Sequence, residues 1–142
     1  MSYEFEKLIQ ERRLIKGKIT SEMISAELKS AEYDLGRAKA SFKAGDFKWA
    51  TVEAYYSMFH AVRALVYSRG YREKSHYALM VAFKELFVDA VVLEKKYHEY
   101  FADAMSLREG ADYRSEYGEG GASETIENAE DMFGKSRQIL RK

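Results

Sequence analysis

Residues 46–69, DFKWATVEAYYSMFHAVRALVYSR, form the stretch that decides the fold. The spacing of their apolar side chains predicts one helix of about six to seven turns at ~3.6 residues per turn. Asp46 is a good N-cap because its carboxylate can accept a first-turn N–H, and Gly70 follows where a left-handed residue is favoured. Apolar side chains cover almost the whole circumference, leaving only a narrow polar arc around Glu53. A helix of this kind is buried by several neighbours, so we predict that it is the central element of a helical bundle.

The bulk composition is that of a globular protein. The chain has 142 residues, of which 46% are hydrophobic and 32% are charged, enough for one domain with a sizeable core. Lysine plus arginine and aspartate plus glutamate both number 23, and this zero net charge argues against tight non-specific nucleic-acid binding. The lack of cysteine excludes disulfides, thiolate zinc sites and cysteine nucleophiles. No apolar run approaches the ~18 residues of a membrane span and no signal peptide is recognisable, so we expect a cytoplasmic protein without membrane contact.

The rest of the chain supplies helices that would cover the central one. We expect a single domain over residues 1–142, with a bundle over 21–141 and an N-terminal extension over 1–18. The extension would contain a short charged helix over 3–16, and residues 70–74 would form a turn. With no proline and a surface rich in Lys and Glu, the chain is predicted to be all-α, an up-and-down bundle of four to five core helices.

Apolar periodicity places the other helices of the bundle. A one-sided seam predicts a helix over 21–43 that forms a tight antiparallel hairpin with the central helix: Ile24, Leu28, Ala31, Leu35, Ala38 and Phe42. A third helix is predicted over 75–88 and a fourth over 91–109, although one kinked helix over both ranges stays open. Residues 110–122 contain three glycines near their end and are predicted to be a loop, after which Ser123 would cap the last helix.

One stripe of the central helix carries four polar or aromatic side chains, Tyr56, His60, Arg63 and Tyr67. Because they recur at helical spacing, they can touch one another or a common ligand. They could form a polar groove that binds a nucleotide or phosphate. The alternative is a buried hydrogen-bonded network, or a dimer seam with tyrosines at its edge.

A second candidate is His76, directly after the expected cap Ser75 and close to Arg72 and Lys74. Cationic groups and free N–H groups at a helix start could bind an anion. A solvated turn explains the same residues. His98, among charged neighbours, reads as a surface side chain.

The third candidate is the segment REGADYRSEY, residues 108–117. Arg108 could bind a phosphate through paired hydrogen bonds, with Asp112 orienting it. An ion-paired helix end is the alternative. The sequence has neither an HExxH motif nor a His/Asp spacing typical of zinc ligands, and no glycine-rich phosphate loop, so we expect no metal and no cofactor.

These segments together resemble the HEPN superfamily, small helical domains named for higher-eukaryote and prokaryote nucleotide-binding proteins, and in particular its prokaryotic UPF0332 branch. The resemblance covers nearly the whole chain. Its most specific parts are AYYSMFHAVRAL in the central helix, KSH after the turn, and LREGADY. It implies a helical bundle that pairs as a homodimer. It also implies that the partner is a minimal nucleotidyltransferase, with the two proteins forming a toxin–antitoxin pair.

The resemblance also bears on catalysis. Active ribonuclease members carry an Arg, four to six residues, and then a His, and two copies cut RNA without metal at the dimer cleft. Here Arg108 matches the Arg, but the following positions hold Tyr113, Arg114 and Ser115. An ordinary tyrosine, with a pKa near ~10, is a poor general base at neutral pH. The missing His therefore argues against ribonuclease activity, unless a remote histidine such as His76 or His60 replaces it in space.

The sequence therefore leads to one main prediction and two alternatives. We predict a homodimeric HEPN subunit that pairs with a minimal nucleotidyltransferase, binds nucleotide, or does both, and that does not itself cut RNA; RNA is a second possible ligand. The alternatives are a divergent metal-independent endoribonuclease toxin and a structural helical adaptor, so whether the chain is an enzyme stays open. In such pairs the nucleotidyltransferase can modify a tyrosine near the motif, which makes Tyr113 and Tyr117 candidates. We also expect Arg108 and the stripe from Tyr56 to Tyr67 to line one groove.

Overall fold

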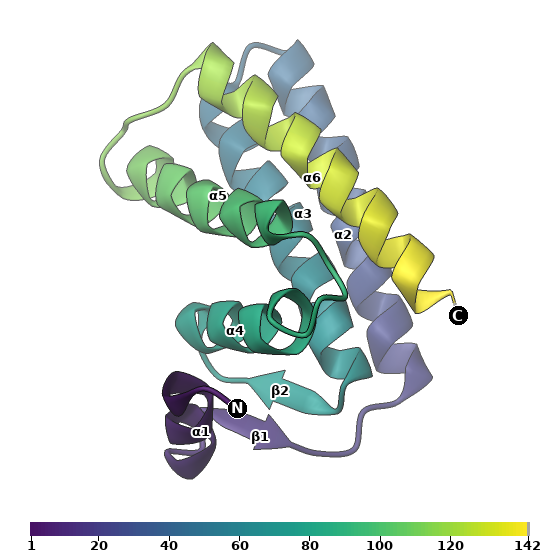
Figure 1. Cartoon of the computed structure of the whole chain (residues 1–142). Helices are drawn as coiled ribbons and strands as arrows, with labels where there is room; N and C mark the ends of the chain where they lie inside the picture. Colours follow the sequence, from purple (N-terminus) through teal and green to yellow (C-terminus); the bar gives the residue numbers. More distant parts are fainter. Residues whose placement is uncertain (142) are drawn as a thin grey trace.

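The computed structural model describes residues 1–141 and confirms an all-α bundle, to which a two-stranded sheet is added (Figure 1). No helix within this range is both long and apolar enough to cross a membrane. The elements in chain order are α1 (Tyr3–Gln10), β1 (Leu14–Lys16), α2 (Ser21–Lys43), α3 (Phe47–Ser68), β2 (Tyr71–Glu73), α4 (His76–Phe83), the π-helical turn η1 (Lys84–Val88), α5 (Lys95–Tyr113) and α6 (Glu119–Leu140).

The helix α3 is the central element, as its sequence predicts. Asp46 caps it by accepting a hydrogen bond from the Trp49 backbone N–H at 3.2 Å, and Gly70 follows it with φ of +86°. Contacts to α2, α4, α5, α6 and β2 surround it. Figure 1 shows α2, α3 and α6 lying alongside one another, with α5 and α4 crossing the other side of α3.

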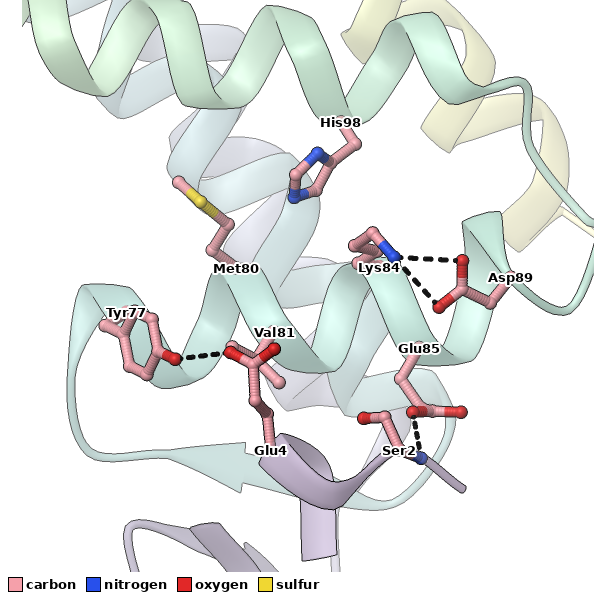
Figure 2. A pocket seen from close by; sticks show the side chains of 9 residues that line it. All are labelled: Ser2, Glu4, Tyr77, Met80, Val81, Lys84, Glu85, Asp89 and His98. Carbon is pink, nitrogen blue, oxygen red and sulfur yellow. Dashed lines mark hydrogen bonds and ion pairs between the residues drawn. The ribbon is translucent and has the colours of Figure 1, made fainter. Parts of the chain in front are cut away.

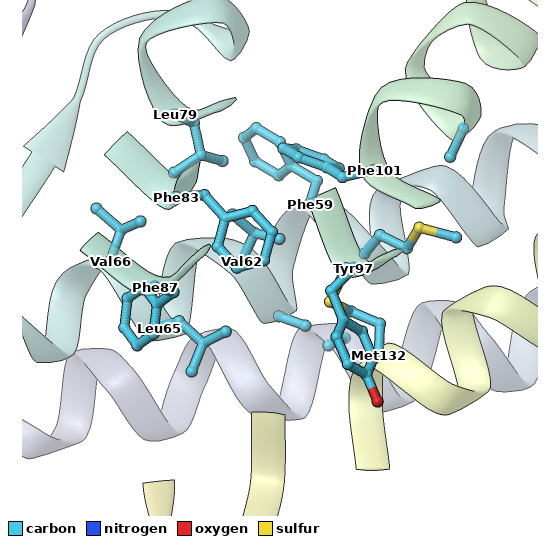
Figure 3. Close-up of a cluster of buried hydrophobic side chains, with 14 of the residues drawn as sticks. Phe59, Val62, Leu65, Val66, Leu79, Phe83, Phe87, Tyr97, Phe101 and Met132 are labelled. Atoms are coloured by element: carbon cyan, nitrogen blue, oxygen red, sulfur yellow. The ribbon is translucent and has the colours of Figure 1, made fainter. Parts of the chain in front are cut away.

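The two sides of α3 are packed differently. Towards α2 the contact is made by small side chains, because Ala31 and Ala38 of α2 and Ala54 and Ala61 of α3 are all fully buried. The Ser57 hydroxyl donates to the Ala31 carbonyl at 2.8 Å, which satisfies a polar group inside this close contact. On the side of α4 and α5 the core is built from large side chains, shown in Figure 3: Phe59, Val62, Leu65, Val66, Leu79, Phe83, Phe87, Tyr97, Phe101 and Met132.

The N-terminal segment differs from the prediction. The helix ends at Gln10 rather than continuing to Lys16, and Arg12 has a φ of +57° that no helix allows. Strand β1 then pairs antiparallel with β2. Residues 71–73, which were predicted to belong to a turn, therefore form a strand. The extra backbone hydrogen bonds of this small sheet run from Gly17 N–H to the Gly70 carbonyl and from Lys74 N–H to the Arg13 carbonyl, both at 3.0 Å.

The connection between α4 and α5 contains a real break. The two-helix alternative is confirmed, but α5 spans Lys95–Tyr113 instead of 91–109. Val91 has a φ of +60°, and the N–H groups of Val92 and Leu93 both donate to the Phe87 carbonyl. Burial of Phe87, rather than a glycine or proline, therefore fixes the turn.

The last helix begins five residues earlier than predicted, at Glu119 with Gly118 as its N-cap, and the connector from α5 is short. Gly120 and Gly121 lie inside its first turn, where the prediction placed a loop. Glycine is a poor helix former, but Ala122 of this turn and Thr125 of the next are buried, so packing outweighs propensity.

Removal of the Leu14 side chain tests how firmly β1 is anchored. Leu14 is 1% exposed, so Leu14→Ala should lower the free energy of unfolding by ~2–4 kcal/mol through lost burial and a residual cavity. Ile15→Ala, on the other face of the same strand, is the matched control and should cost less than half as much. Urea denaturation measures both, and equal losses would show that β1 is not anchored through Leu14.

Candidate functional site

Arg108 of α5 reaches across to the central helix and is enclosed by aromatic rings. Its Nη2 donates to the Tyr56 hydroxyl at 2.7 Å. The centre of its guanidinium lies 5.6, 5.4 and 5.5 Å from the ring centroids of Tyr55, Tyr56 and Tyr113. The side chain is only 14% exposed, and its buried Nε makes no hydrogen bond within residues 1–141. Asp112, one turn further on, approaches this Nε at 3.9 Å, a loose ion pair.

His76 joins the same group of side chains from the start of α4. Ser75 caps this helix by accepting from the Ala78 N–H at 3.0 Å, which places His76 at the first helical position. Its Nδ1 lies 2.5 Å from the Tyr55 hydroxyl oxygen. The imidazole lies nearly parallel to the Tyr55 ring, with centroids 5.8 Å apart, and packs on Phe59 at 4.6 Å. We call this group the Arg108 cluster: Tyr55, Tyr56, His76, Arg108, Asp112 and Tyr113.

The electrostatics of the cluster leave one strong cation beside a neutral imidazole. Burial, and then the positive charge of Arg108, lower the pKa of His76 below its usual value, so the ring is uncharged at pH 7. Burial also raises the pKa of the Tyr55 phenol, which stays protonated. A planar guanidinium fixed on aromatic rings presents its remaining N–H groups in a set direction, which suits a phosphate oxygen.

The other three residues of the predicted stripe belong to a separate ion-paired network. Arg63 pairs with Glu73 at 2.7 Å and with Glu27 at 3.1 Å. The two ring nitrogens of His60 lie 3.4 Å from Glu27 and 3.6 Å from Asp34. This is the hydrogen-bonded network that the sequence left open as an alternative.

Tyr67 lies beside Arg63, with its ring centroid 5.7 Å from the guanidinium carbon, and is 8% exposed. Of the four stripe residues, only Tyr56 therefore reaches Arg108. Phe59 lies between the two groups and contacts both His76 and Arg63. His60, Arg63 and Tyr67 thus lie on the side of α3 that faces α2 and β2, whereas Tyr56 reaches α5.

Tyr55, Glu27 and Glu73 were missed from the sequence. Tyr55 lies on the apolar face of α3, and its only signal is a hydroxyl at a position where a phenylalanine would fill the same space. Such a hydroxyl needs a partner when it is buried. Glu27 and Glu73 are separated from Arg63 by 36 and 10 positions, and no local pattern links them to it.

A cavity of about 240 Å³ opens between α1, α4 and α5 (Figure 2). His98 is half-buried there, which corrects its assignment to the open surface, and burial followed by the charge of Lys84 lowers its pKa. Several polar groups that line the cavity already have partners, since Tyr77 donates to Glu4 at 2.6 Å and Lys84 pairs with Asp89 at 3.2 Å. Nowhere in residues 1–141 do three or more His, Cys, Asp or Glu side chains gather as a metal site.

The two tyrosines considered for modification are accessible. Tyr113, the last residue of α5, is 71% exposed, and Tyr117, in the connector to α6, is 55% exposed. The connector is short and fixed by the Gly110 carbonyl, which accepts hydrogen bonds from the N–H groups of Arg114 and Glu116. Tyr113 therefore combines an open hydroxyl with a ring packed on Arg108.

Comparison with known proteins agrees with this fold. The HEPN domain family matches residues 24–142, and the chain belongs to this family. It is 30% identical over 112 residues to a Methanocaldococcus jannaschii protein named "Putative toxin MJ0605", covering 79% of this chain and 84% of that protein. It is 29% identical over 85 residues to the "UPF0332 protein PH1297" of Pyrococcus horikoshii, covering 60% of each.

A solved structure gives the same fold. The crystal structure of TT1696 from Thermus thermophilus superposes with a TM-score of 0.69, covering 81% of this chain and 96% of that one. At 18% identity this likeness concerns the fold alone. The resemblance to the HEPN superfamily read from the sequence is thus confirmed. The family match begins at residue 24, within α2, so α1 and β1 lie outside the matched residues.

The lowered pKa of His76 predicts that stability falls on mild acidification. Between the unfolded pKa of ~6.5 and the lower folded value, the unfolded chain binds a proton that the folded chain does not. The free energy of unfolding should therefore decrease as the pH falls below ~6.5. His98, whose pKa is also lowered, acts in the same direction.

Urea denaturation of the wild type, His76→Gln and His98→Gln at pH 7.5 and 5.5 separates the two contributions. Each substitution should reduce the loss of stability between the two pH values. A loss in His76→Gln as large as in the wild type would contradict the assignment to His76.

Proposed function

We propose that this chain is the HEPN subunit of a two-component toxin–antitoxin pair, and that as a homodimer it binds a phosphate of RNA or nucleotide at the Arg108 cluster without cutting it. The observation that carries the proposal is Arg108, which Tyr56 and two further rings fix in place while its buried Nε remains without a hydrogen bond. The toxin–antitoxin assignment is supported by the names of two Methanocaldococcus jannaschii relatives, both of which are called "Putative toxin".

The charge distribution favours a local anion site over a broad nucleic-acid surface. The chain has no net charge, so binding depends on individual cations rather than on an overall field. Asp112 approaches Arg108 only at 3.9 Å, whereas an N–H···O contact to an anion is typically ~2.7–2.9 Å. A phosphate that reaches Arg108 therefore gains contacts that Asp112 does not make.

One observation favours the alternative of a metal-independent endoribonuclease. The structure brings His76 to Tyr55 and Tyr56, the residues that also contact Arg108, and so places a histidine in the cluster where the motif lacks one. A neutral imidazole is the usual general base of such chemistry. RNA cleavage in the presence of EDTA decides between binding alone and cleavage.

Replacement of Arg108 tests the binding site. A hydrogen bond to a charged group contributes ~1.5–3 kcal/mol, so Arg108→Ala should weaken binding of a short single-stranded RNA by at least ~10-fold. Arg114→Ala is the matched control, because Arg114 is 57% exposed and pairs only with Glu116, and its affinity should stay within ~2-fold. Fluorescence anisotropy measures both variants, and circular dichroism confirms that they fold.

The same proteins are incubated with RNA and EDTA. We expect no cleavage by the wild type. Cleavage that Arg108→Ala abolishes would establish the ribonuclease alternative. Equal RNA affinity for the wild type and Arg108→Ala would contradict the phosphate site.

The proposed nucleotidyltransferase partner leads to a separate prediction. Incubation with that enzyme and ATP should add the mass of one nucleotidyl group, and the modified residue should be Tyr113 or Tyr117. Tyr113→Phe and Tyr117→Phe should show which one, while Tyr33→Phe, which removes a 68% exposed tyrosine on α2, is the control. Intact-mass analysis measures the addition, and an unmodified chain would contradict this part of the proposal.

A further inference from the structure

We infer that Tyr55 is a positioning residue that makes His76 a hydrogen-bond donor: its hydroxyl donates to His76 Nδ1 and so leaves the ring proton on Nε2. The role of that donor rests on the proposed function, because its partner would be the bound phosphate. The direction of the hydrogen bond itself is independent of any ligand.

The direction follows from the burial of Tyr55. Its side chain is 0% exposed, and its hydroxyl oxygen lies 2.5 Å from His76 Nδ1, its hydrogen-bond partner in the described chain. If Nδ1 carried the proton, it would donate to the phenol oxygen, and the phenol hydrogen would be buried without an acceptor. Buried donors are almost always paired, so the phenol donates and Nδ1 accepts.

Packing keeps the ring in this orientation. The Tyr55 ring lies nearly parallel to the imidazole, at an interplanar angle of 16°, and Phe59 packs on it at 4.6 Å. The backbone before His76 is fixed by the pairing of β2 with β1 and by the Ser75 cap. His76 itself keeps intermediate exposure, so the ring edge that carries Nε2, away from Tyr55, is the one that a ligand can approach.

The cluster then offers donors of different kinds to one anion. Arg108 supplies guanidinium N–H groups, and Tyr56 accepts one of them, so its own hydroxyl hydrogen is free to donate. His76 adds its Nε2–H. An imidazole protonated at Nε2 cannot accept a proton there, so this tautomer serves phosphate binding and not general-base catalysis at that atom.

The tautomer can be measured directly on the full chain. In ¹⁵N-labelled protein at pH 7.5, long-range ¹H–¹⁵N spectra should show His76 with an unprotonated Nδ1 and a protonated Nε2, with His76→Gln identifying its signals. Tyr55→Phe keeps the ring but removes the donor, and His76 should become a mixture of both tautomers. Tyr97→Phe, which removes a buried hydroxyl bonded to Asp131 at 3.0 Å, should leave the His76 signals unchanged. A proton on Nδ1 in the wild type, or an unchanged tautomer in Tyr55→Phe, would overturn the inference.

Binding of the single-stranded RNA probe tests the role of the donor. His76→Gln keeps a side-chain N–H and should retain affinity within ~3-fold, whereas His76→Leu should lose at least ~10-fold. Equal losses in both variants would overturn the donor role. If the wild type binds no RNA while the spectra show the Nε2–H tautomer, the proposed function fails and the hydrogen-bond assignment stands.

Discussion

The requirement to bury α3 on all sides governs the rest of the structure. Fourteen of its residues are buried, and five other elements are needed to cover it. Two kinds of packing meet this requirement, small alanines against α2 and large aromatic side chains against α4 and α5. Because the helix is so fully covered, each polar group on it must find a partner inside the protein. The candidate site arises from this constraint, since Tyr55 finds its partner on α4 and Tyr56 finds its partner on α5.

The small sheet gives the N-terminal segment, α1 and β1, a structural role. Strand β1 lies outside the part of the chain that matches the HEPN family, yet it pairs with the strand that leads directly into α4. Glu73 at the end of β2 pairs with Arg63, and Ser75 begins the helix that carries His76. The N-terminal segment therefore fixes the one segment of the site that is not part of a long helix. The effect is confined to this part of the molecule, because α1 packs on α4, whereas α2 and α6 pack on α3.

The parts that were predictable from the sequence are those with a local, periodic signal. Apolar side-chain spacing predicts the helices α2 and α3. The residue types at the two ends of α3 predict its limits, Asp46 as the N-cap and Gly70 as the residue that follows. The pairing of β1 with β2 does not, because three-residue strands have no period of their own and the paired residues Ile15 and Arg72 lie 57 positions apart. Glycines at the start of α6 suggested a loop, although the burial of Ala122 outweighs their weak helix propensity. Arg108 was identified by its motif, but its contact with Tyr56 spans 52 positions and required the fold.

Two groups of polar side chains contact α3, one around Arg63 and one around Arg108, and they differ in the partners of the arginine. The first group stabilises the fold, whereas the second is suited to binding a ligand. In the network around Arg63, cations and carboxylates are matched, and the guanidinium already bonds to Glu73 and Glu27 at short distances. An added anion would have to displace those carboxylates. Around Arg108 the neighbours are aromatic rings and a distant carboxylate, which direct the guanidinium without neutralising it by a close ion pair. Because water is largely excluded by the rings, one such cation interacts strongly with an anion even in a chain without net charge. This difference in partners, rather than the number of charges, is what makes Arg108 the better candidate for binding a phosphate.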